Sequence, residues 1–123
     1  MIKSLLIVGA GSFVGGAARY LLSTLLKSTF PLGTLTVNLL GCFLIGLIYA
    51  IFQRAGAPSS SWCLLLTTGF CGGFTTFSTF SNDALQMLQA CSLIPFIAYV
   101  SLSVIGGIAL AALGYKTYFF FSV

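Results

Sequence analysis

The residues best suited to chemistry lie in one short stretch, residues 69–81, which reads GFCGGFTTFSTFS. Gly72 and Gly73 are poor helix formers and the threonines after them compete for backbone hydrogen bonds, so we expect a helix to break within residues 72–76. In a membrane-spanning segment, unwound backbone is tolerated only where it is buried in protein or lines a wet cavity. Freed carbonyls there can hold a cation, whereas a half-helix N-terminus and hydroxyls favour an anion. A packing kink is the alternative.

Two phenylalanines follow the expected break. Phe77 and Phe80 lie three residues apart and therefore share one helix face. Their neighbours carry hydroxyls, Thr79 and Ser81 among them, so the surroundings of the rings are polar. Because a benzene ring has a negative face and a positive edge, an anion can lie against the ring edges without a formal charge nearby. We predict that these rings contact an anion, and contact with lipid or a neighbouring helix is the alternative.

Polar residues also recur at helical spacing in two other hydrophobic segments. Thr34, Asn38 and Cys42 are spaced by four and form one stripe. A desolvated asparagine amide needs a partner or a cavity, so Asn38 either bonds to another helix or donates to an anion. Tyr99 and Ser103 repeat the spacing and add hydroxyl donors, unless their role is structural. Such donors can form a track that replaces the water shell of an anion.

The charged candidates are Arg19 and Asp83. Arg19 lies near the end of the first hydrophobic segment. It either snorkels to the headgroups or raises the anion concentration at a vestibule. Asp83 is the only acidic residue, and it either pairs with Arg19 or bonds to hydroxyls beside the ion path. Its charge opposes an anion unless it is protonated, paired or turned away, so it is a secondary candidate.

The composition is that of a membrane protein. The 123 residues are 59% hydrophobic and 5% charged, which leaves too few charges to cover a soluble fold. The length fits one domain, residues 1–123. The basic residues are scattered, which argues against binding of nucleic acid. Without histidine, and with one carboxylate side chain, no catalytic constellation can be assembled, so we expect no enzyme. The four cysteines are interpreted as small apolar residues.

Four stretches are long enough to cross a hydrocarbon core of about 30 Å as helices. They cover approximately residues 4–26, 33–52, 62–90 and 95–118. The sequence thus predicts an all-α, multi-pass integral membrane protein with a broken third helix. Its basic residues favour one side only weakly, so the chain can insert both ways. Two opposite copies would pair as an antiparallel dual-topology homodimer.

Small residues are plentiful within the predicted spans. Gly11 and Gly15 form a GxxxG pattern, as do Gly69 and Gly73. Such patterns let helix backbones approach closely in lipid. They predict close packing, either within one chain or between two copies.

Three segments together resemble the small fluoride-channel family, often called Fluc. They are GGAARY at residues 15–20, GTLTVNLLG at residues 33–41 and the stretch at residues 69–81. The resemblance covers the whole chain, and its third motif is the most specific. It implies a fluoride-selective channel of the bacterial plasma or inner membrane that passively exports fluoride and so lowers its cytoplasmic level. It also implies an antiparallel homodimer in the lipid bilayer, with two pores and a structural sodium ion (Na+) at its centre.

By motif position, the resemblance implies roles for individual residues. The fluoride contacts, the polar track and the vestibule would be formed by Phe77, Phe80, Asn38, Tyr99, Ser103 and Arg19. The sodium ligands would be the backbone carbonyls of Gly72 and Thr75 from each subunit. Two departures affect the ion path. Gly107 stands where another hydroxyl is expected, and Asp83 replaces a longer carboxylate.

Two other functions fit four short spans. A small dual-topology multidrug exporter needs a carboxylate in its first span to exchange protons for cationic drugs, and this chain has Arg19 there instead. A non-transporting membrane scaffold would need only the packing glycines. Substitution of Phe77 or Phe80 by isoleucine separates the scaffold from the channel, since only the channel should lose conduction.

Overall fold

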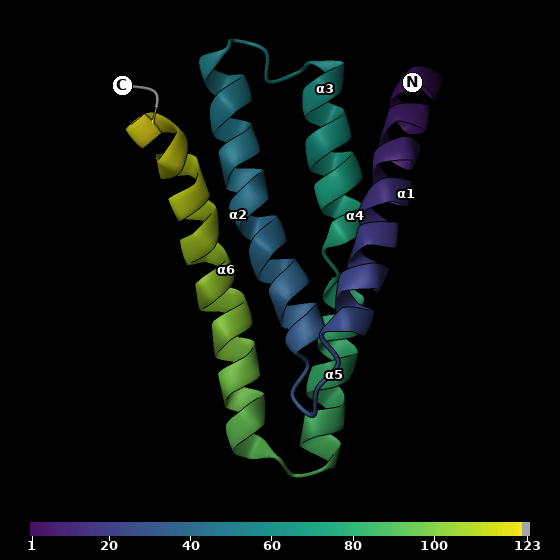
Figure 1. The fold of residues 1–123 in the computed structure, drawn as a ribbon, viewed down its shortest axis with the longest axis vertical. Coiled ribbons are helices and arrows are strands. Elements are labelled where there is room, and N and C mark those ends of the chain that lie inside the picture. Colours follow the sequence, from purple (N-terminus) through teal and green to yellow (C-terminus); the bar gives the residue numbers. More distant parts are fainter. Residues whose placement is uncertain (122–123) are drawn as a thin grey trace.

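The computed structural model describes residues 1–121, which form four long helical rods joined by short connections (Figure 1). The rods are α1 (Ile2–Leu25), α2 (Leu32–Arg54), a third rod in several parts, and α6 (Leu93–Phe121). The third rod consists of α3 (Ser61–Leu64), the π-helix η1 (Leu65–Cys71), α4 (Gly72–Phe74) and α5 (Phe77–Gln89). All four rods are long and apolar enough to cross a membrane. The all-helical membrane fold is confirmed, and the predicted span boundaries lie within three residues of the observed ones.

The third rod breaks at two threonines. Thr75 and Thr76 have extended backbones, with φ/ψ of −90°/158° and −149°/117°. The Thr76 hydroxyl then caps α5 by accepting the backbone N–H of Thr79 at 3.2 Å, as N-cap threonines commonly do. The predicted break within residues 72–76 is therefore confirmed, at the threonines rather than at the glycines. The sequence did not predict the π-helix just before it.

Close packing of the rods depends on glycines. A Cβ atom on Gly11 would lie 2.5 Å from the carbonyl oxygen of Leu65, and one on Gly15 would overlap the carbonyl oxygen of Phe70. On the other side of the molecule, Gly46 of α2 lies directly against the Ala111 backbone of α6. These contacts join rods of one chain, so packing within the chain is one use of the small residues.

Replacing Gly46 by alanine is expected to loosen the packing of α2 on α6. The new methyl group would overlap the Ala111 carbonyl, which cannot move without shifting α6. Overpacking of this kind costs about 1–3 kcal/mol, so the thermal unfolding midpoint of the protein in detergent should fall. Gly9→Ala is the matched control, because nothing lies within 4 Å of a Cβ atom there. Equal midpoints for the two variants would contradict the close contact.

The core that positions the break is small. Leu35 of α2, Phe80 and Ala84 of α5, and Tyr99 of α6 form a buried cluster. Much of the remaining apolar surface is exposed, as expected for helices that face lipid. The cluster therefore fixes α5 against α2 and α6 on the C-terminal side of the break.

Candidate ion-conduction site

Asn38 holds the backbone of the break. Its Nδ2 donates to the Thr76 carbonyl oxygen at 3.1 Å, and its Oδ1 accepts from the Thr76 N–H at 2.8 Å. An asparagine amide has two N–H donors, and among residues 1–121 one of them is used here. Asn38 thus makes the predicted bond to another helix and still has a donor to spare.

Several carbonyls at the break lose their helical donors, those of Gly72 and Thr75 among them. In a continuous α-helix the Thr76 N–H would bond to the Gly72 carbonyl, and the Thr79 N–H to the Thr75 carbonyl. Instead, the first N–H bonds to Asn38 Oδ1 and the second to the Thr76 hydroxyl. Freed backbone carbonyls of this kind are suitable ligands for a sodium ion. Gly72 and Thr75 are the two residues whose carbonyls the sequence resemblance assigned to sodium.

A cavity of about 480 Å³, here called the break cavity, lies beside the break in the third rod. Six of the predicted site residues line it, namely Asn38, Gly72, Thr75, Phe77, Phe80 and Ser103. The Ser103 Oγ atom is buried and has no hydrogen-bond partner in the part of the chain that the structure describes. The cavity therefore combines an amide, several hydroxyls and three aromatic rings, the third being that of Tyr49, with no charged side chain in its lining.

The aromatic rings beside the cavity contact one another edge to face. The Phe77 and Phe80 ring centroids are 5.8 Å apart with an interplanar angle of 82°. Phe80 contacts Tyr99 in the same way, at 5.1 Å and 80°. Phe77 is 82% exposed and Phe80 is 9% exposed. The predicted shared face of Phe77 and Phe80 is confirmed, and one ring is fixed in the core while the other projects from the chain.

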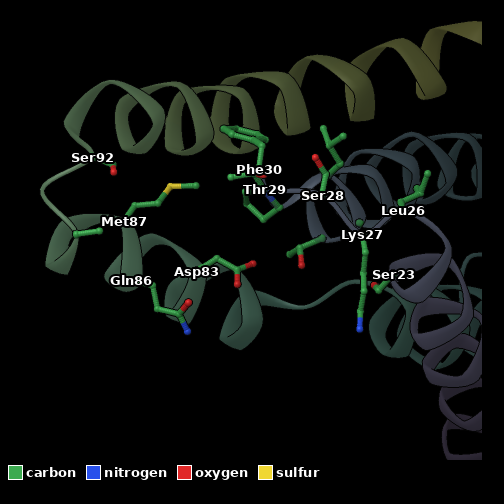
Figure 2. A pocket seen from close by; sticks show the side chains of 15 residues that line it. Ser23, Leu26, Lys27, Ser28, Thr29, Phe30, Asp83, Gln86, Met87 and Ser92 are labelled. Atoms are coloured by element: carbon green, nitrogen blue, oxygen red, sulfur yellow. The ribbon is translucent and has the colours of Figure 1, made fainter.

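A second cavity, of about 550 Å³, lies beside the connection between α1 and α2 and is called the connection cavity (Figure 2). Asp83 and Gln86 of α5 line it together with Lys27, Thr29 and Thr34. This cavity, unlike the first, carries charged side chains of both signs. Thr34 is buried. This member of the predicted stripe lines the connection cavity and not the break cavity.

Tyr99 lines neither cavity but contacts a lining residue of each. Its hydroxyl donates to Asp83 Oδ2 at 3.1 Å, and its ring contacts Phe80. Asp83 lines the connection cavity and Phe80 lines the break cavity, so the buried Tyr99 side chain lies between one lining residue of each. Of the two arrangements predicted for Asp83, the structure shows the bond to a hydroxyl.

Three predicted site residues lie elsewhere. Thr79 and Ser81 are exposed on α5 and line neither cavity. The Thr79 hydroxyl accepts a hydrogen bond from the Thr76 hydroxyl at 3.2 Å. Arg19 Nε donates to the Gly73 carbonyl oxygen at 3.1 Å, so its guanidinium supports the backbone before the break. The vestibule role of Arg19 stays a prediction.

Sequence reasoning missed the contacts that Thr76 and Phe30 make in the site. Thr76 lies in the predicted break, but its backbone hydrogen bonds to Asn38 were not predicted. They join positions that are 38 residues apart, and no local sequence pattern indicates them. Phe30 packs on Tyr99 at 5.6 Å and 84° between rings. Its place just before Pro31 suggested only a connection between helices.

Comparison with known proteins establishes the family. The family described as CrcB-like protein, Camphor Resistance (CrcB), matches residues 6–115, which include both sides of the break. The chain belongs to the CrcB-like family. Its curated relatives confirm the resemblance of the three motifs to the small fluoride-channel family.

Curated relatives of this CrcB-like chain are named as fluoride channels. "Fluoride-specific ion channel FluC" of Leptospira interrogans serogroup Icterohaemorrhagiae serovar copenhageni (strain Fiocruz L1-130) is 50% identical over 116 residues, 91% of each chain. The protein of the same name from Pseudomonas putida (strain W619) is 42% identical over 125 residues, 99% of this chain and 98% of its own. "Fluoride-specific ion channel FluC 1" of Yersinia pestis is 44% identical over 118 residues, 94% of this chain and 93% of its own. With its four apolar rods, the CrcB-like chain is a multi-pass bacterial membrane protein.

Proposed function

We propose that this CrcB-like chain is a fluoride-selective channel, not an enzyme, and that it lets fluoride leave the cell passively. The observation that carries the proposal is the break cavity, which collects Asn38, Ser103, Phe77 and Phe80 in a chain 50% identical to a curated fluoride channel. The names of the relatives favour this function over drug export or a scaffold role.

The chemistry of the cavity suits a small anion. Fluoride is tightly hydrated, so close donors must replace its water as it passes. The free N–H of Asn38, the Ser103 hydroxyl and the positive edges of the rings can supply them. Because these donors are fixed in place, a larger halide would fit them less well. A membrane potential that is negative inside drives an anion outward by about 2.3 kcal/mol per 100 mV, so no energy source is needed.

Asp83 is compatible with this route. Its carboxylate accepts a hydrogen bond from the Tyr99 hydroxyl, and the Tyr99 ring packs on Phe80, which lines the break cavity. Lys27 lines the same cavity as Asp83 and offsets its charge there. The acidic group therefore faces the connection cavity, away from the uncharged donors.

We further infer that two copies form an antiparallel homodimer in the bilayer. Phe77 projects from α5 with 82% of its surface exposed, although it belongs to the proposed route. An inverted second copy placed on this face would enclose the ring and the break cavity. The weak bias of the basic residues allows both orientations.

A structural sodium ion fits the same arrangement. The carbonyls of Gly72 and Thr75 have lost their helical N–H donors, so they can serve as ligands. Two carbonyls from each copy would give four oxygen ligands at the dimer centre. When bound, such an ion would hold the two broken helices together by electrostatic attraction to these oxygens.

The function is tested by ion flux from liposomes. Purified protein should release fluoride rapidly and retain chloride, because only the smaller anion is matched by the fixed donors. Fluoride and chloride electrodes measure the two fluxes in parallel vesicles. Equal release of both ions would refute selectivity, and no release of either would favour a scaffold.

Dual orientation is tested at Cys91. This cysteine is exposed in the turn between α5 and α6, whereas Cys63 and Cys71 are buried. If the chain inserts both ways, a membrane-impermeant maleimide should label roughly half of the protein in intact cells, and the rest after permeabilisation. Cys91→Ser is the control and should remove the signal. Labelling entirely from one side would contradict dual topology.

A further inference from the structure

A groove at the start of the chain is separate from the proposed ion route. It has a volume of about 560 Å³ and runs between residues 2–10 of α1 and residues 61–65 of the third rod. Figure 1 shows the starts of α1 and α3 at the same end of the molecule. Its lining is apolar at Leu6, Ile7 and Leu65, with Lys3 and Trp62 also contributing. We propose that this groove binds an anionic phospholipid.

The charge of the groove favours an anionic headgroup. Lys3 is the only charged side chain in its lining. The only acidic side chain of the protein, Asp83, lines the connection cavity and is bonded to Tyr99. A lysine close to the membrane surface attracts anionic lipid. A phosphate diester is therefore the natural partner of the Lys3 ammonium group.

The shape of the groove and its level in the membrane favour a lipid. Trp62 is 67% exposed, and exposed tryptophans of membrane proteins prefer the headgroup level. Leu6, Ile7 and Leu65 extend the groove along α1 and the third rod with apolar surface that an acyl chain can cover. A second copy is the less suitable occupant, since its single carboxylate side chain is already hydrogen bonded.

The protein carries its own probe for this site. Trp62 is its only tryptophan, so intrinsic fluorescence excited at the indole band reports on this groove alone. The protein is reconstituted in mixed vesicles in which either the phosphatidylglycerol or the phosphatidylcholine carries brominated, quenching acyl chains. We expect a preference of roughly fivefold for phosphatidylglycerol next to Trp62, the scale of one lysine near an anionic lipid surface.

Variants of one exposed lysine separate this site from a general surface effect. Lys3→Gln should reduce the preference to near onefold, and Lys3→Arg should retain it. Lys116→Gln is the matched control, because Lys116 lies on α6, is exposed and does not line the groove. It should leave the preference unchanged.

Three results would overturn the proposal. Equal quenching by the two brominated lipids would show no headgroup preference. An undiminished preference in Lys3→Gln would remove the lysine from the site. Weak quenching by both lipids would show that a second copy covers Trp62.

Discussion

Replacing Phe77 by isoleucine is expected to abolish fluoride flux while leaving the fold intact. Phe77 is 82% exposed and packs edge to face on Phe80, so little core packing is lost. Isoleucine keeps the apolar bulk but has no positive ring edge. We expect flux from liposomes to fall by about 100-fold or more, the scale of losing one preorganised group that stabilises charge. Thermal unfolding measures the intact fold, and crosslinking measures the proposed dimer.

Phe13→Ile is the matched control for this result. Phe13 is 79% exposed, but it lies on α1 and lines neither the break cavity nor the connection cavity. It should conduct like the unmodified protein. Normal flux through Phe77→Ile, or equal losses in both variants, would remove the ring from the ion route.

Replacing Asn38 by alanine is expected to remove both conduction and stability. The substitution leaves the Thr76 N–H and carbonyl without their partners at the break. Each unsatisfied buried group costs about 1–3 kcal/mol, less where water can reach it. The free amide donor is lost as well. Fluoride flux and the thermal unfolding midpoint should therefore fall together.

A second substitution at this position separates the two roles. Asn38→Asp keeps an oxygen that can accept the Thr76 N–H but places a negative charge in the break cavity. It should unfold at a higher temperature than Asn38→Ala and still conduct no fluoride. Asn82→Ala, at an exposed position of α5 that lines neither cavity, should change neither property. Full flux through Asn38→Ala would refute the assigned role.

Much of the fold follows from local patterns in the sequence. The span lengths depend on apolar runs, and the break depends on the threonines that follow Gly73, so both could be predicted. The shared face of Phe77 and Phe80 follows from helical spacing and is seen in their edge-to-face contact. The π-helix at residues 65–71 could not be predicted, because its apolar pattern is that of an ordinary helix.

The site was predictable in its members but not in its connections. The pairing of Asn38 with Thr76 requires α2 to lie beside the third rod, which no local pattern specifies. Nor does helical spacing decide which hydroxyls near the rings border a cavity. Thr79 and Ser81 are exposed outside both cavities, whereas Ser103, on another helix, lines the break cavity.

In the proposed channel, the bond between Asn38 and Thr76 would make the binding of two ions depend on one side chain. By taking the Thr76 N–H, the amide frees the Gly72 carbonyl, which would hold the proposed sodium ion, and Asn38 also lines the break cavity, the proposed route of the anion. If both ions bind as proposed, cation affinity and anion selectivity are thermodynamically linked through position 38. A variant evolved there for another halide would also bind its alkali metal with altered strength.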